Sequence, residues 1–257
     1  MAIKIQDVSY NYGHEDVIKK INLDFVPGQL VSLVGPNGAG KTTLLKLISG
    51  VLEPASGQIH IYDQLSENLS HKERALLISL VPQNPNLPLE MGITDFIMLG
   101  RNPHLKLLQW ESAADFKIAQ ESINLTEIDH LIQRKLGEVS GGERQRIMLA
   151  LAMTQRSPIM LLDEPTSNLD ISHQTKVMSL IKKIHDQKPN DGATILAIHD
   201  LNIAAQFSDR VILFSEGIVA VDGTPEEVLT KNNIEAIYGS EVSIIPHPEH
   251  GSPLIIS

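Results

Sequence analysis

The sequence predicts an α/β fold built around a mostly parallel β-sheet. Short apolar runs recur along the chain, helical patterns lie between several of them, and a glycine-rich loop joins one run to a helical pattern. Strands that alternate with helices along a chain are typical of parallel sheets covered by those helices. The apolar runs are residues 30–34, 76–81, 159–162, 194–198 and 211–214.

The first part of the chain is predicted to be an antiparallel β part. Polar and apolar residues alternate in 18–26, which indicates a half-buried strand that ends at the turn pair Pro27-Gly28. The apolar face of this strand consists of Ile21, Leu23 and Phe25. After the glycine-rich loop, one side of the predicted helix is formed by Leu44, Leu45, Leu47 and Ile48.

A helical insertion is predicted between about residues 86 and 155, where the strand signal fades. Segments 112–123 and 126–134 have helical patterns. We therefore expect a single domain, 1–257, with a β core of residues 1–85 and 156–257 and a helical subdomain of residues 86–155.

A late helix is predicted to begin at residues 224–227. Thr224 suits the N-cap, Pro225 suits the first helical position, and Glu227 can reach back to the cap. The final residues form short apolar pairs whose role the sequence does not indicate.

Composition excludes several classes of function. The chain has 257 residues, 42% of them apolar, and no cysteine, so disulfides, thiolate metal sites and cysteine nucleophiles are excluded. A net charge of −10 opposes non-specific attraction to nucleic acid. Early charges and the lack of an apolar run of ~20 residues predict neither a secretory signal nor a membrane span, so any membrane role is expected to involve a partner.

Residues 35–42 match the phosphate-binding P-loop pattern, with a strand predicted before it and a helix after it. Glycines let backbone amides surround phosphate oxygens, and the helix N-terminus adds a positive dipole. Lys41 supplies a point charge, and the Thr42 hydroxyl can bind Mg²⁺. The flanking elements disfavour an ordinary glycine-rich turn. The candidate nucleotide-binding residues are Gly35, Pro36, Asn37, Gly38, Ala39, Gly40, Lys41, Thr42 and Thr43.

Two acids follow the apolar run 159–162, at the strand end where open α/β sheets bind ligands. Asp163 is predicted to hold Mg²⁺. Glu164 is predicted to orient or deprotonate the attacking water as a general base. The alternative, a simple turn before Pro165, is disfavoured by the presence of a P-loop in the same chain.

His199 and Gln83 also follow predicted strands. His199 could contact the γ-phosphate or its attacking water, because it projects from the same sheet edge. From this spacing alone, an incidental strand-end histidine is favoured, with Asp200 capping the next helix. Gln83 is likewise interpreted as a solvated loop residue.

A second anion site is predicted where Ser140-Gly141-Gly142-Glu143 precedes the helical stretch 144–155. Its backbone amides and the Ser140 hydroxyl can form a helix-end cradle for phosphate. Both cradles could hold one nucleotide within a single chain, or each chain could complete its neighbour's site. The residue pattern alone does not choose between these arrangements.

The order of these motifs resembles the ATPase subunit of ATP-binding-cassette (ABC) transporters over most of the chain. The resemblance implies that Gln83 is the Q-loop residue, a candidate both for catalysis and for metal binding, and that His199 is the switch histidine. It also implies that Ser140, Gly141 and Gly142 form the signature that closes on the γ-phosphate of the opposite subunit. Val139 and Glu143 depart from the common Leu-Ser-Gly-Gly-Gln signature, but the serine and glycines are retained.

Two further motifs rest on this resemblance. Residues 167–170 resemble the D-loop that links the two sites, with Asp170 as a candidate site residue. Tyr12 resembles the aromatic residue that stacks on adenine. Tyr10 lies nearby, and an aromatic strand residue is commonly a packing residue.

Three stretches resemble the ATPases of ferric-siderophore, haem and cobalamin importers: residues 99–104, 199–205 and 223–229. The resemblance implies an ATP-hydrolysing subunit that powers import of a metal chelate through a separate permease. It further implies that the insertion containing Arg101 to His104 forms a groove for the permease's coupling helix. The alternative is a polar turn that breaks a helix at Gly100 and Pro103.

The partners implied are a second copy of the chain, which binds two Mg-ATP molecules with the first, the permease, and indirectly a solute-binding protein. No nucleic-acid partner is expected. The implied location is the cytoplasmic face of the membrane. An exporter ATPase and a soluble ABC ATPase without a permease are the alternative functions.

Overall fold

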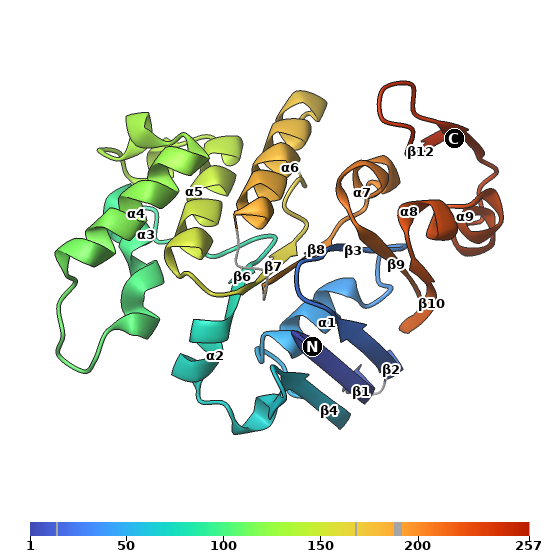
Figure 1. Cartoon of the computed structure of the whole chain (residues 1–257), viewed down its shortest axis with the longest axis horizontal. Helices are drawn as coiled ribbons and strands as arrows, with labels where there is room; N and C mark the ends of the chain where they lie inside the picture. Colours follow the sequence, from blue (N-terminus) through green and yellow to red (C-terminus); the bar gives the residue numbers. More distant parts are fainter. Residues whose placement is uncertain (14, 168, 188–191, 257) are drawn as a thin grey trace.

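A six-stranded sheet forms the centre of the computed structural model, which describes residues 1–13, 15–167, 169–187 and 192–256 (Figure 1). The strand order is β10-β9-β3-β8-β7-β6, and all neighbouring pairs are parallel except β9 with β10. This confirms the predicted α/β fold with a mostly parallel sheet. The strands are β3 (Leu30–Val34), β6 (Ile78–Val81), β7 (Ile159–Asp163), β8 (Ala193–Ala197), β9 (Arg210–Ser215) and β10 (Ile218–Gly223).

A second sheet, fully antiparallel, is formed by the N-terminal part of the chain in the order β2-β1-β4-β5. Its strands are β1 (Ile3–Tyr12), β2 (Glu15–Phe25), β4 (Ser56–Ile61) and β5 (Gln64–Leu65). Helix α1 (Lys41–Ile48) packs its apolar side into the core between the two sheets. The predicted face of Ile21, Leu23 and Phe25 points into this core.

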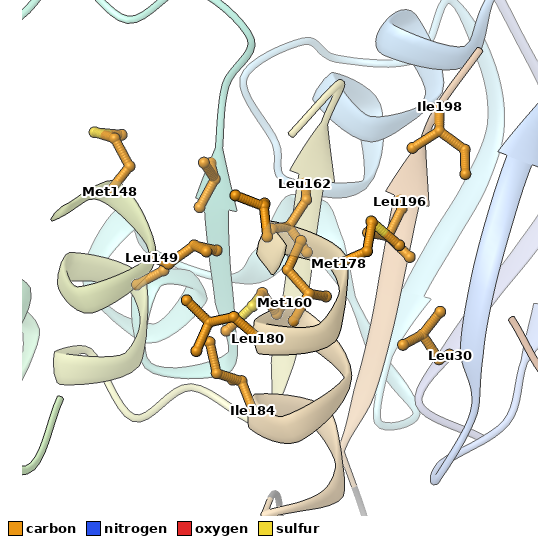
Figure 2. Close-up of a cluster of buried hydrophobic side chains, with 14 of the residues drawn as sticks. Leu30, Met148, Leu149, Met160, Leu162, Met178, Leu180, Ile184, Leu196 and Ile198 are labelled. Atoms are coloured by element: carbon orange, nitrogen blue, oxygen red, sulfur yellow. The ribbon is translucent and has the colours of Figure 1, made fainter. Parts of the chain in front are cut away.

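The other face of the main sheet is covered by helices. Figure 2 shows side chains of α5 and α6 packed on residues of β7 and β8. The α-helices beyond α1 are α2 (His71–Leu77), α3 (Ile93–Met98), α4 (Ala113–Thr126), α5 (Gly141–Thr154), α6 (Ile171–Asp186), α7 (Leu201–Phe207), α8 (Pro225–Val228) and α9 (Lys231–Tyr238). The described residues also form 3₁₀ segments: η1 (Ser66–Asn68), η2 (Leu99–His104), η3 (Asp129–Leu131) and η4 (Leu136–Glu138).

The central strands are mostly apolar because both faces of the sheet are covered. In β3, Leu30 and Val34 join the core beneath α5 and α6, whereas Val31 and Leu33 join the core around α1. Successive side chains of a strand point to opposite faces, so both sets must be apolar. The continuous apolar runs of the sequence have this physical cause.

Two predicted boundaries are wrong. The run 76–81 is a strand only from Ile78, because the preceding residues end helix α2, which begins with a Ser70–Glu73 capping box. Segment 126–134 is not a helix: α4 ends at Thr126, and Glu127 takes a left-handed conformation with φ of 58°. Beyond it only the short η3 forms, so the apolar periodicity there extends past the real helix end.

A buried ion pair ties the segments of the helical region together. Arg101 in η2 donates from Nε to Asp115 Oδ1 over 2.9 Å and from Nη1 to the Thr154 carbonyl over 2.9 Å. Both ionic side chains are buried. Arg101 is therefore an internal brace of the helical region. The groove for the permease's coupling helix and the subdomain boundaries stay predictions.

Asp115 gives this region a testable dependence on pH. Hydrogen bonds from Ser112 and then from Arg101 lower the pKa of Asp115 from its ordinary 3.8 to about 2. Since the folded pKa is the lower one, the stabilisation is complete above about pH 4 and disappears as the pH falls to about 2. We expect Asp115→Asn to lower the free energy of unfolding by about 2 kcal/mol at pH 7.

The measurement is urea unfolding of both proteins at a series of pH values. The difference in unfolding free energy between the unaltered protein and the Asp115→Asn variant should shrink between pH 4 and pH 2, roughly the interval between the two pKa values. A difference that stays constant over this interval would show that the Asp115 charge does not contribute.

The C-terminal part contains the predicted late helix and a hairpin. Helix α8 begins with a Thr224–Glu227 capping box and Pro225 in its first turn, as predicted. The apolar pairs at the end form an antiparallel hairpin of β11 (Ser243–Pro246) and β12 (Pro253–Ile256). Within the described ranges, no helix combines the length and the apolar content that a membrane span requires.

Candidate nucleotide-binding and hydrolysis site

Four neighbouring strands bring the candidate residues to one edge of the main sheet. The P-loop follows β3, His199 follows β8, Glu164 follows β7, and Gln83 follows β6. Because these strands are parallel, their carboxyl ends meet at the same edge. Sequence positions that are far apart are therefore adjacent in space.

The P-loop has backbone conformations that depend on glycine. Gly35 has φ of 142°, and a Cβ there would lie 2.2 Å from the Phe214 carbonyl oxygen. Gly40 has φ of 104°, and its Cβ would lie 2.9 Å from the Val17 carbonyl oxygen. Gly38, with φ of 79°, faces open space. The loop therefore packs on β9 and β2 at its ends, while its exposed middle can receive a phosphate chain.

Lys41 is the buried cation of this loop. Its side chain is held by two carbonyl groups of the loop, at 2.7 Å from Gly35 O and 2.9 Å from Pro36 O. Burial lowers the pKa of Lys41, while the carboxylates of Glu164 and Asp163 raise it. The charge is thus placed inside the loop, where it can meet the phosphates that the amides surround.

Thr42 and Asp163 form an oxygen pair next to Lys41. The Thr42 hydroxyl donates to Asp163 Oδ1 over 2.7 Å. The pKa of Asp163 is raised, chiefly by burial, and the hydrogen bond from Thr42 offsets part of this rise. A buried carboxylate with a neighbouring hydroxyl is the donor set that Mg²⁺ prefers, so these two residues fit that ion.

Glu164 lies between the other two catalytic candidates. One carboxylate oxygen accepts from Gln83 Nε2, and the other contacts His199 Nε2. Glu164 takes a left-handed backbone conformation with φ of 49°, and its amide donates to the Ala197 carbonyl of β8 over 2.8 Å. Such strain in a non-glycine residue is typical of functional sites. The structure therefore places both Gln83 and His199 against Glu164, and neither is an isolated loop residue.

The predicted D-loop is joined to Glu164. Ser167 donates to the Glu164 carbonyl from its hydroxyl over 2.9 Å and from its amide over 3.1 Å. Asp170 caps α6 by accepting from the His173 amide, and this bond together with those from the His173 ring and Ser172 lowers the pKa of Asp170 to about 2. Asn168 lies outside the described residues.

The signature residues lie at the N-terminus of α5. The Ser140 hydroxyl donates to Glu143 over 2.8 Å and accepts from the Glu143 amide over 3.3 Å. Ser140 and Gly141 are exposed, and a Cβ at Gly141 would meet no atom within 4 Å. The hydrogen bonds of the Ser140 hydroxyl thus stay within the first turn of α5. The exposed N-terminus of this helix is open to a ligand.

The remaining P-loop candidates differ in exposure, and Tyr12 lies at the edge of the site region. Asn37 is exposed, whereas Ala39 and Thr43 are buried. The Tyr12 ring is half exposed and meets Tyr10 edge to face, with ring centroids 4.9 Å apart. It can present a face to a base, but this role stays a prediction.

Tyr238 is a residue near the P-loop that sequence reasoning missed. Burial raises the pKa of Tyr238 to about 12, and the neighbouring Gly35 backbone partly opposes this rise. Tyr238 ends helix α9, about two hundred positions after Gly35 along the chain. No motif surrounds it, so only the fold brings the two together.

A phosphate-binding loop followed by acids at the edge of a parallel sheet defines a P-loop ATPase. The chain can be assigned more closely, because the pattern of the ABC transporter family matches residues 18–167. This protein belongs to the ABC transporter family, and it is an ATP-hydrolysing member.

Similar proteins agree with this assignment. A hemin import ATP-binding protein of Bordetella avium is 36% identical, over 100% of this chain and 99% of its own length. The ferric enterobactin transport ATP-binding protein of Escherichia coli is 34% identical, over 98% of this chain and 92% of its own. A solved inward-facing ABC transporter, described as of metal-chelate type, superimposes with a TM-score of 0.85 at 25% identity, covering 99% and 96% of the two chains.

Proposed function

We propose that this protein is the ATP-hydrolysing subunit of a metal-chelate importer, acting through a separate membrane permease. The observation that carries the proposal is the assembled site, in which Glu164 contacts both Gln83 and His199 next to the P-loop. The similarity to hemin and ferric enterobactin import subunits supports the class of cargo. Haem, a ferric siderophore and cobalamin remain the candidate cargoes.

The chemistry assigned to these residues is attack of water on the γ-phosphorus of ATP. Glu164 accepts a proton from the water, the new phosphorus–oxygen bond forms, and the bond to the β-phosphate oxygen breaks to release ADP and phosphate. Gln83 and His199 hold the two carboxylate oxygens of Glu164 in place. Lys41 and the loop amides balance the charge of the phosphates.

Thr42 and Asp163 are the residues proposed to hold Mg²⁺. When bound, the ion supplies positive charge to the terminal phosphates. The buried Asp163 carboxylate supports this assignment, because a cation offsets the cost of burying its charge. Gln83 stays a candidate for additional coordination, although its amide nitrogen contacts Glu164 in this structure.

Two copies of the chain are proposed to share each nucleotide. The exposed position of Ser140 and Gly141 supports this, since a helix end with free space before it can accept a phosphate from another molecule. Helices α1 and α5 also pack in different cores on opposite faces of the main sheet. Closure around ATP in the dimer would move the permease between its two orientations, and hydrolysis would reopen it.

A mixing experiment tests the shared site. Chains carrying Lys41→Ala and chains carrying Ser140→Arg are each expected to lose ATPase activity, by loss of the phosphate charge and by obstruction of the signature. A mixed dimer retains one site with an unaltered P-loop and an unaltered signature. Random pairing of equal amounts makes about half of the dimers mixed, and each of these keeps one of its two sites. We therefore expect the mixture, but neither variant alone, to hydrolyse ATP at about a quarter of the unaltered rate.

The control for this experiment is each variant mixed with itself at the same total concentration. Activity that does not return in the mixture, while native electrophoresis shows that mixed dimers form, would mean that each chain completes its own site. The folded state of both variants is checked by circular dichroism.

The import proposal is tested with the permease. The protein is copurified with its membrane partner, placed in liposomes with the solute-binding protein, and assayed with haem, a ferric siderophore and cobalamin. We expect one chelate to stimulate ATP hydrolysis and to accumulate on the other side of the membrane. An exporter would instead move its cargo in the opposite direction, and a soluble ABC ATPase would copurify with no permease.

A further inference from the structure

The C-terminal segment, residues 231–256, lies against the helix that follows His199. It consists of helix α9 and the hairpin β11–β12. Strand β12 packs on helix α7, which begins just after His199. None of the motifs described above gives this segment a role.

Asn202 joins α7 to the hairpin with both ends of its side-chain amide. Its oxygen accepts from the Ile255 backbone amide over 2.7 Å, and its nitrogen donates to the Ile255 carbonyl over 3.1 Å. Both residues are partly buried, so water competes less for these bonds. Two bonds to one residue's backbone fix both the distance and the orientation of α7 relative to β12.

The backbone between His199 and Asn202 is fixed as well. Asp200 caps α7 by accepting from the amides of Asn202, over 2.8 Å, and Ile203, over 3.0 Å. His199 precedes this cap directly and contacts Glu164 through its ring. A shift of the first turn of α7 would therefore be passed to the His199 ring.

The C-terminal segment is itself anchored to the protein core. Ile234 and Val242 are buried in the core beneath α5 and α6, and Ile244 and Ile255 pack on its edge. The Val242 amide donates to Glu235 Oε1 over 3.1 Å, which ties the hairpin to α9. The segment thus forms a rigid support for α7 and not a free tail.

We infer that the C-terminal segment positions the histidine side of the nucleotide site, with Asn202 as the positioning residue for His199. This inference rests on the role of His199 proposed above. Loss of the two Asn202 hydrogen bonds would loosen α7 and weaken the contact between His199 and Glu164.

The test is the kcat and KM for ATP of Asn202→Ala in the purified full chain, without permease or chelate. We expect kcat to fall about tenfold with KM changed less than about twofold, because coupling through one neighbouring residue is commonly of this size. Asn233→Ala is the matched control. Asn233 is an asparagine of the C-terminal segment that donates to the Val228 carbonyl over 2.9 Å but does not bond to α7.

The control variant should keep its kcat even if its melting temperature falls. An equal loss of kcat in both variants, or an unaltered kcat in the Asn202→Ala variant, would overturn the inference. If Asn202→Ala does not fold, Asn202→Asp serves instead. It keeps the acceptor for the Ile255 amide but loses the donor, so its kcat should lie between that of the unaltered protein and about one-tenth of it.

A double-mutant cycle separates this inference from the proposed role of His199. His199→Ala alone reports whether His199 contributes to turnover. If Asn202 acts through His199, the double variant should be no slower than His199→Ala. Additive losses would show that Asn202 acts by another route, and a normal rate in His199→Ala would remove the proposed role of His199 instead.

Discussion

Glu164→Gln is expected to reduce the turnover number for ATP by at least ~10²-fold, the usual effect of losing a positioned general base. Glutamine has the same shape but cannot accept the proton of the attacking water. ATP affinity should be retained, because the loop amides and Lys41, which are proposed to bind the phosphates, are unchanged. Steady-state hydrolysis and calorimetric binding of ATP measure the two quantities separately.

The matched control for this variant is Glu127→Gln. Glu127 is also a glutamate in a left-handed backbone conformation, with φ of 58°, but it ends α4 and pairs with Arg146. Its replacement should leave turnover unchanged. Near-normal hydrolysis in the Glu164→Gln variant would remove Glu164 from the role of base and would direct attention to another proton acceptor.

Lys41→Ala is expected to abolish measurable ATP binding. The lysine carries the cation that the P-loop encloses, and burial makes a charge at this position interact strongly with phosphate. An alanine leaves the Gly35 and Pro36 carbonyls without their donor as well. Calorimetry or fluorescent-nucleotide titration measures the affinity.

Lys46→Ala is the matched control for the loss of charge. Lys46 lies in the last turn of the same helix α1, where it lowers the pKa of Asp163 but is not enclosed by the loop. Its replacement should leave ATP affinity within a few-fold of the unaltered value. If the Lys41→Ala variant retained micromolar affinity for ATP, the assignment of residues 35–42 as the phosphate-binding loop would be contradicted.

Gln83 and His199 are the two neighbours of the Glu164 carboxylate. Their roles could not be determined from the residue pattern. A histidine or a glutamine after an apolar run is more often incidental, and only the family resemblance singles out Gln83 and His199. The structure places both on Glu164 because β7 lies between β6 and β8. That order depends on which strands pair. Because backbone hydrogen bonds are much the same for every pairing, residue types within one strand do not reveal its neighbours.

The helical region shows a similar limit. No feature of the motif around Arg101 predicts that this residue is buried against Asp115. Charged residues are rarely buried, so a sequence pattern gives no signal for such a pair. The end of α4 is also misplaced by the pattern, because the apolar spacing continues beyond the left-handed residue Glu127 that ends the helix.

Local sequence determined the parallel sheet, the P-loop between β3 and α1, and the acids after β7, because each depends on residue types within a few positions of one another. Tertiary structure alone decided that Glu164 lies between Gln83 and His199, that Arg101 is internal, and that the C-terminal hairpin braces α7. Those relations arise from packing between segments far apart in the chain, which adjacent residue types do not encode.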